Sequence, residues 1–167
     1  KTAYEIPKRD WSSDVCSSDL VDFVRHLNAA KEPLFTDIGY HAESDDTGEV
    51  ELAWQWNTGY HEGLHSFANG ISTTEGGMHA EGFKRAVTQV VNRYAKGRNL
   101  LKGKETTLQG DDVREGLTAI VSVRLADPQF EGQTKGKLGN TEMRSLVRSE
   151  EHTSELQSRF GISYAVF

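Results

Sequence analysis

The sequence predicts an α+β domain in which a mixed sheet of about four strands is backed by helices. Residues 49–57 alternate between apolar and polar side chains, which is typical of a strand with one buried face. Residues 79–96 carry an apolar stripe at helical spacing, and residues 117–125 form an apolar run typical of a buried strand. Because each such element must bury its apolar face against another, the pattern favours helices layered on a sheet.

The individual elements follow from local patterns along the chain. Val21, Val24 and Leu27 repeat at helical spacing ahead of Pro33, which cannot continue a helix. Gly97 is placed to end the longest helix. The expected elements are, in order, a helix over 21–30, a strand over 36–40, a turn over 45–48, a strand over 49–57, its hairpin partner over 64–69, a loop over 75–77, a helix over 79–96, a turn over 112–116 that Asp111 and Asp112 cap, a strand over 117–125, a loop over 128–137 and a helix from about residue 140.

The two ends of the chain are not expected to belong to this domain. Residues 148–158 (RSEEHTSELQS) can be encoded by a nucleotide string whose reverse complement, read in a shifted frame, encodes residues 10–20 (DWSSDVCSSDL). Residues 162–167 and 1–6 are related in the same way, so the matches occur in mirror order. This symmetry resembles translated sequencing-library adapter. We therefore expect 1–20 and 148–167 to be adapter-derived tails and 21–147 to be the domain.

Composition excludes several classes of protein. The 167 residues carry a formal charge of −6, so the chain is not a broadly basic nucleic-acid binder. Cys16 is the only cysteine, which excludes an intrachain disulfide and argues against a cysteine-built zinc site. The sequence contains neither a long apolar run nor a signal peptide, so we expect a cytoplasmic protein that makes no membrane contact.

The segment 129–140 (QFEGQTKGKLGN) is the most informative candidate site. Its three glycines allow a ligand to approach the backbone closely, and Gln133, Thr134, Lys135 and Lys137 supply donors. A helix N-terminus follows, which suits a phosphate or another anion. The spacing is not that of a Walker loop. From the residues alone, anion binding and an ordinary polar loop both remain open.

A second candidate is a run of cations between residues 84 and 104. Its members, without an intervening acid, are Lys84, Arg85, Arg93, Lys96, Arg98, Lys102 and Lys104. Such a segment can face nucleic acid, but it can also be the solvated face of a helix.

Two other groups are weaker candidates. His61 and His65 have a spacing that could chelate a metal on a helix, but they sit among glycines without an evident third ligand, so we expect no metal site. Asp111, Asp112 and Glu115 beside Arg114 are read as a helix cap rather than as catalytic acids.

Five stretches, taken together, resemble a known family. They are VDFVRHLN (21–28), VELAWQWN (50–57), SFANGISTTEGGMHAEGF (66–83), DDVREGLTAIVSV (111–123) and QFEGQTKGKLGNTEMRS (129–145). In this order they resemble the transducer region of DNA gyrase B subunits, the ATP-hydrolysing subunits of bacterial type II topoisomerases. Topoisomerase IV B subunits are a similar alternative, and a standalone nucleic-acid-binding module that uses residues 84–104 is a further one.

The resemblance implies a fold like the second domain of ribosomal protein S5. It implies that Gln133 and Lys135 contact the γ-phosphate of ATP, with Mg²⁺ held by an ATP-binding domain outside this segment. It also implies the gyrase A subunit, a second B subunit and double-stranded DNA as partners, with Lys84, Arg85, Arg93, Lys96 and Arg98 as candidate DNA-facing residues. No complete catalytic set is present, so the segment alone is expected to be inactive as an enzyme.

Overall fold

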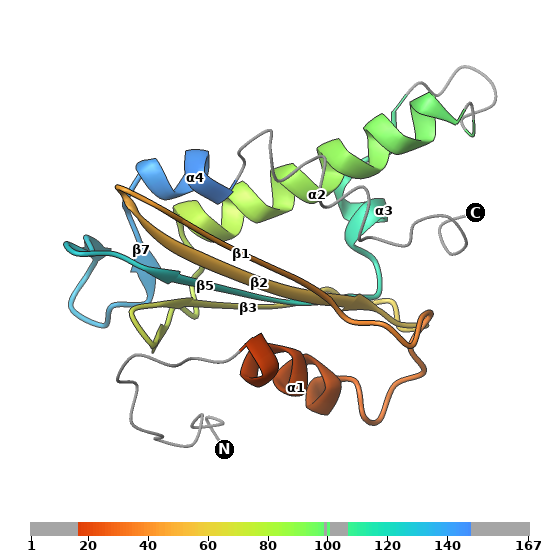
Figure 1. The fold of residues 1–167 in the computed structure, drawn as a ribbon, viewed down its shortest axis with the longest axis horizontal. Coiled ribbons are helices and arrows are strands. Elements are labelled where there is room, and N and C mark those ends of the chain that lie inside the picture. The colour runs from red at the N-terminus through yellow and green to blue at the C-terminus, as the bar shows by residue number, and fades with distance from the viewer. Residues whose placement is uncertain (1–16, 99, 101–106, 148–167) are drawn as a thin grey trace.

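The computed structural model describes residues 17–98, 100 and 107–147 (Figure 1). Its elements are α1 (Ser17–Leu27), β1 (Gly39–Asp45), β2 (Gly48–Trp56), β3 (Gly63–Ala68), β4 (Ile71–Ser72), α2 (Met78–Gly97), α3 (Gly110–Arg114), β5 (Leu117–Arg124), β6 (Phe130–Glu131), β7 (Lys137–Leu138) and α4 (Glu142–Val147). Within the described residues, no helix is both long and apolar enough to cross a membrane.

The main sheet has five strands in the order β1-β2-β5-β3-β4, and β6 and β7 form a separate two-stranded sheet. All neighbours in the main sheet are antiparallel except β3 and β5, which are parallel. The mixed α+β class is therefore confirmed, with one more strand than the approximate four expected. The expected hairpin between 49–57 and 64–69 is wrong, because β5 lies between β2 and β3.

The true hairpin partner of β2 is β1, which begins at Gly39, near the end of the expected strand over 36–40, and continues to Asp45. The expected turn over 45–48 is confirmed: Asp45 Oδ1 accepts hydrogen bonds from the backbone N–H of Thr47 (2.7 Å) and of Gly48 (3.0 Å). This aspartate closes the turn through its side chain, as Asx turns do. β1 is an edge strand of largely polar residues, so its sequence lacks the apolar alternation that marks β2.

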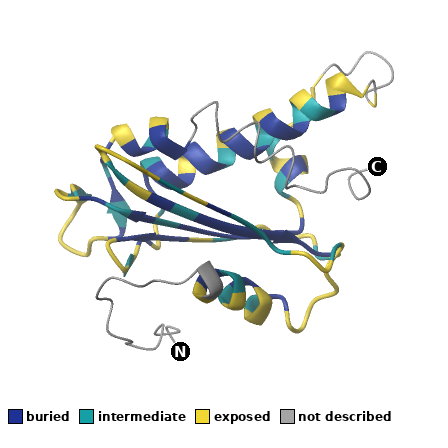
Figure 2. Ribbon diagram, viewed as in Figure 1, coloured by how far each residue is buried: buried dark blue, intermediate teal, exposed yellow. Residues whose placement is uncertain are grey.

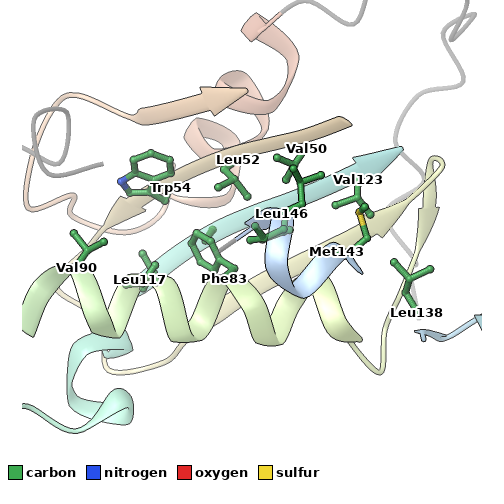
Figure 3. Close-up of a cluster of buried hydrophobic side chains, with 14 of the residues drawn as sticks. Val50, Leu52, Trp54, Phe83, Val90, Leu117, Val123, Leu138, Met143 and Leu146 are labelled. Atoms are coloured by element: carbon green, nitrogen blue, oxygen red, sulfur yellow. The ribbon is translucent and has the colours of Figure 1, made fainter. Parts of the chain in front are cut away.

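The sheet lies between two helical layers (Figure 1). α2, α3 and α4 lie on one face and α1 lies on the other. The larger core fills the space under α2 and α4, and its buried residues run along the strands and helices in Figure 2. Figure 3 shows Leu52, Trp54 and Leu117 of the sheet facing Phe83 of α2 and Leu146 of α4. Both expected apolar faces, that of 49–57 and that of 79–96, are thus confirmed.

On the opposite face, α1 begins at Ser17 and ends at Leu27, a shift of several residues from the expected 21–30. Leu20 and Val24 pack against Ile120 of the sheet in a second, smaller core. α1 therefore begins within the range 1–20 that the nucleotide symmetry assigns to adapter. The adapter origin of both ends stays a prediction, and residues 1–16 and 148–167 lie outside the described part of the chain.

A buried amide cluster joins the C-terminal end of α1 to the sheet. Asn28 Nδ2 donates to Gln55 Oε1 (2.8 Å), and Asn57 Nδ2 donates to Asn28 Oδ1 (3.2 Å) and to Thr118 Oγ1 (3.1 Å). The Thr118 hydroxyl in turn donates to Asn28 Oδ1 (2.7 Å). Because buried polar groups are costly unless they are paired, this closed set fixes one position of α1 on the sheet.

The expected cap at Asp111 and Asp112 is wrong. The N-cap of α3 is Gln109, whose side chain makes no capping hydrogen bond, and both aspartates lie in the first turn of the helix. Asp111 instead accepts a hydrogen bond of 2.6 Å from Arg114 one turn later. The first-turn carboxylates still interact favourably with the positive end of the helix dipole.

Candidate functional site

The expected loop over 128–137 is a short β-hairpin. β6 pairs antiparallel with β7, and Gln133, Thr134 and Lys135 lie exposed at its tip. The backbone of Lys135 adopts a positive φ of 54°. Such a conformation is uncommon for a residue other than glycine and occurs mostly in tight turns. Both Gln133 and Lys135 are therefore accessible to solvent at the tip of the hairpin.

The hairpin is hydrogen-bonded to the segment that leads into α2. The backbone N–H of Glu75 donates to the carbonyl of Gly136 (2.9 Å), and the N–H of Leu138 donates to the carbonyl of Gly76 (3.2 Å). Gly77 and Leu138 form a parallel bridge, and the Leu138 side chain is fully buried in the larger core. Residues 75–77 thus lie alongside β7 and are joined to it by backbone hydrogen bonds.

The base of the hairpin is held by Asn140. Its Oδ1 accepts a 2.6 Å hydrogen bond from the backbone N–H of Gln129, and its Nδ2 donates to the carbonyl of Asp127 (3.2 Å). The N–H of Gly139 also donates to the carbonyl of Gln129 (2.7 Å). The two ends of the hairpin are therefore closed on each other, whereas the tip is free to meet a ligand.

The two lysines of the hairpin differ in their surroundings. Lys137 Nζ lies 2.8 Å from Glu131 Oε2, and this hydrogen bond raises the pKa of Lys137. Lys135 Nζ lies 5.9 Å from the centroid of the Phe130 ring, and no described carboxylate forms an ion pair with it. Lys135 is thus the cation of the hairpin whose charge is available to an external anion.

The cations of α2 and its C-terminal end fall into two groups, those that contact another side chain of the domain and those that are exposed. Lys84 is drawn into an ion pair with Glu62 (2.9 Å), and the Arg98 guanidinium lies 5.5 Å from the centroid of the Tyr94 ring. Arg85, Arg93 and Lys96 are exposed, and within the described residues no carboxylate pairs with them. The other two expected members, Lys102 and Lys104, lie outside the described residues.

Glu62 forms a cluster that sequence reasoning missed. It accepts from Lys84 and, at 3.1 Å, from Arg114 Nε, so it joins the segment before β3 to α2 and α3. Burial alone would raise the pKa of Glu62, but the hydrogen bonds from the two cations outweigh it and lower that pKa. Because Glu62 and Arg114 are 52 positions apart in sequence, no local pattern could indicate the pair.

Two histidines, His65 and His79, differ in their surroundings. His65 lies on β3 beside the Phe23 ring (6.1 Å between centroids), so the helical spacing that a His61–His65 chelate needs is not formed. His79 in the first turn of α2 is fully buried, with its Nε2 atom 3.2 Å from Thr73 Oγ1. Burial lowers the pKa of His79 to about 4. This neutral, buried histidine was not singled out from the sequence.

Comparison with known proteins identifies the family of this chain. The model of the DNA gyrase B family matches residues 19–160. The DNA gyrase B subunit of Mycobacterium tuberculosis is 56% identical over 129 residues, and that of Streptomyces coelicolor is 55% identical over 132 residues. Each alignment covers 77% of this chain and 19% of the relative, so the chain spans about a fifth of the length of these relatives.

Solved structures share the fold. The 43K ATPase domain of Thermus thermophilus gyrase B, in complex with an aminocoumarin, superposes with a TM-score of 0.77 at 34% identity, covering 87% of this chain and 40% of that one. The ATP-binding domain of Francisella tularensis topoisomerase IV gives a TM-score of 0.66 at 23% identity, covering 87% and 37% of the two chains, which shows the shared fold alone. On the family match and this extent of identity, the chain is a fragment that belongs to the DNA gyrase B family.

Proposed function

We propose that residues 21–147 are the transducer region of a gyrase B subunit, which couples the binding and hydrolysis of ATP to closure of a dimer of B subunits and to DNA strand passage. The observation that carries this proposal is the exposed tip of the β6–β7 hairpin, where Gln133 and Lys135 lie on a base fixed to the domain. A fixed base and a free tip suit a group that reports on a ligand bound to another domain.

The chemistry of the tip fits a terminal phosphate. Lys135 supplies a cation without a carboxylate partner among the described residues, and Gln133 supplies an amide donor. A hydrogen bond from a charged donor contributes about 1.5–3 kcal/mol. The contact is lost when the γ-phosphate leaves, so it favours one arrangement of the two domains only while ATP is intact.

The remaining features of the proposal follow from the family. ATP would be the substrate, with Mg²⁺ bound by the ATP-binding domain. The gyrase A subunit, a second B subunit and double-stranded DNA would be the partners, in the cytoplasm. The segment would adopt the fold of the second domain of ribosomal protein S5, and by itself it would neither hydrolyse ATP nor change DNA topology.

Substitution of Lys135 in the complete protein tests the phosphate contact. Lys135→Ala is expected to lower ATP turnover at least tenfold, since about 1.4 kcal/mol corresponds to a factor of ten and the contact contributes at least that much. Lys137→Ala is the matched control, because it removes the same charge from the same hairpin but from an ammonium already paired with Glu131. Equal turnover in the Lys135→Ala variant and the wild type would refute the proposal.

DNA proximity is supported by the exposed cations Arg85, Arg93 and Lys96 on α2. If α2 faces a DNA duplex in the enzyme, the double variant Arg93→Glu/Lys96→Glu lowers supercoiling while leaving the DNA-independent ATP turnover unchanged. If the chain is instead a standalone nucleic-acid-binding module, it binds duplex DNA by itself with a steep dependence on salt. Absence of binding at about 50 mM salt rejects that alternative.

A further inference from the structure

We infer that Gly77 is a positioning residue for the ATPase reaction: it lets the segment 75–77 pack against β7 and so fixes the hairpin that carries Lys135. This inference rests on the proposed function of Lys135. It adds that the position of the hairpin is set by backbone contacts to the segment immediately before α2.

The first support is the pairing itself. Glu75 and Gly76 bond to the backbone on either side of Lys137, through the Gly136 carbonyl at 2.9 Å and the Leu138 N–H at 3.2 Å. Both bonds use main-chain atoms, so they hold β7 in one register whatever side chains it carries. Because Lys135 directly precedes Gly136, a bond at Gly136 fixes the chain one residue away from the proposed phosphate contact.

The second support is the space at Gly77. A Cβ atom at this position would lie 2.6 Å from both the backbone nitrogen and the carbonyl oxygen of Leu138. Real Cβ atoms essentially never approach backbone so closely, and β7 has no flexible side chain at this contact that could move aside. Any other residue at position 77 therefore pushes β7 and the hairpin away from α2.

The neighbouring glycine provides a matched control. Gly76 and Gly77 both have φ values that favour glycine, 78° and 144°. A Cβ at Gly76 would meet only the methyl group of Ala80, at 3.7 Å, an ordinary contact. Both Gly76→Ala and Gly77→Ala place an alanine at a positive φ, with the greater strain at Gly77, whose φ of 144° and ψ of −172° are essentially restricted to glycine. Only Gly77→Ala also brings a Cβ atom against the backbone of β7.

The consequence for the reaction is a misplaced cation. A shift of about 1 Å in a positioning group can lower a rate by about 100-fold. Gly77→Ala displaces the same group that Lys135→Ala removes, so the two substitutions disrupt one contact. Their effects on turnover should not add when they are combined, whereas the effects of independent structural defects should add.

The experiment measures kcat and KM for ATP in the complete protein carrying Gly76→Ala, Gly77→Ala, Lys135→Ala and the pair Gly77→Ala/Lys135→Ala. We expect Gly77→Ala to lower kcat/KM by about tenfold or more, up to the full loss seen in Lys135→Ala, and Gly76→Ala to lower it by less than about fivefold. We expect the pair to be no worse than Lys135→Ala alone. Equal effects of the two glycine variants, or an additive effect in the pair, would overturn the inference.

Amide hydrogen exchange on the present chain tests the anchor without ATP. In Gly77→Ala the Leu138 amide should exchange faster, whereas the amides of Val87 and Val90 in the middle of α2 should keep their wild-type protection. Unchanged exchange at Leu138 would overturn the anchor even if Lys135→Ala is inactive. If Lys135→Ala is fully active, the proposed function fails, and the role of Gly77 in the reaction fails with it.

A second variant covers the case in which Gly77→Ala does not fold. Leu138→Ala removes the fully buried side chain of β7 without introducing a clash at Gly77. The inference expects it to lower kcat/KM and to be non-additive with Lys135→Ala in the same way. Wild-type kcat/KM in Leu138→Ala, with the Leu138 side chain removed from the core, would contradict it.

Discussion

His79 makes the stability of the domain depend on pH between about 4 and 6.5. Its imidazole is fully buried, and burial lowers its pKa from 6.5 to about 4. The Nε2 atom lies 3.2 Å from Thr73 Oγ1, and the Nδ1 atom has no hydrogen-bond partner in the described part of the chain. The protonated imidazole carries N–H groups on both nitrogens, so it would be a buried cation whose Nδ1–H lacks an acceptor.

The direction and size of the effect follow from this difference in pKa. Above pH 6.5 the histidine is neutral in both the folded and the unfolded chain, so its contribution to stability is fully present. Below pH 6.5 the unfolded chain binds the proton first, and the free energy of unfolding falls as the pH falls toward 4. The difference in pKa corresponds to a loss of about 3 kcal/mol across that range.

Urea unfolding of the wild type and of His79→Gln between about pH 4 and pH 7.5 measures this loss. Glu51 has a pKa raised mainly by burial, and Glu62 has a lowered pKa, so both contribute slopes of their own. Those slopes are common to the two proteins and cancel in the difference. The stability of wild type relative to His79→Gln should fall as the solution becomes more acidic. A difference that does not change with pH would refute the reasoning.

Three further experiments test the core, the buried amide cluster and the chain ends. Phe83→Ala removes a side chain from the centre of the larger core and should lower the free energy of unfolding in urea by about 3–5 kcal/mol, whereas Leu34→Ala at an exposed position should change it by no more than about 0.5 kcal/mol. Similar losses in the two variants would contradict the described packing. Thr118→Val removes the hydroxyl of the buried amide cluster and should lower the free energy of unfolding by about 1–3 kcal/mol in the same assay, and Thr118→Ser, which keeps a hydroxyl, should recover most of this loss. Equal losses in the two variants would show that the hydroxyl does not contribute to stability. Deletion of 1–15 and 148–167 should leave the thermal unfolding midpoint unchanged within error, and a drop of several degrees would contradict the adapter interpretation.

The elements that sequence analysis placed well are those whose own side chains bury one face. Trp54 and Trp56 alternate with polar residues on β2, and both enter the larger core. The pairing of the strands could not be predicted in this way. Alternation of apolar and polar residues identifies the buried face of a strand, but it does not identify the strand that hydrogen-bonds to it. Residues 64–69 follow β2 in sequence and suggested a hairpin, yet β3 pairs in parallel with β5. The half-exposed edge strand β1 has no apolar alternation, and the strand expected over 36–40 therefore overlaps only the first two residues of β1.

In the candidate site, too, side chains could be predicted from the sequence and the contacts between segments could not. Gln133 and Lys135 could be proposed from the sequence because their hydrogen-bond donors belong to their own side chains and lie in a recognisable motif. The contacts that hold them were missed because these contacts are made by the main chain of residues 75–77 and 136–138, which any sequence possesses. Gly77 is the one residue whose type depends on this contact, because a side chain there would meet the backbone of Leu138. A glycine in a loop can be required for several reasons, so the sequence alone does not indicate this contact. The proposed phosphate contact would therefore depend on two kinds of residue: a cation that a motif indicates, and a glycine that matters because β7 packs against its backbone.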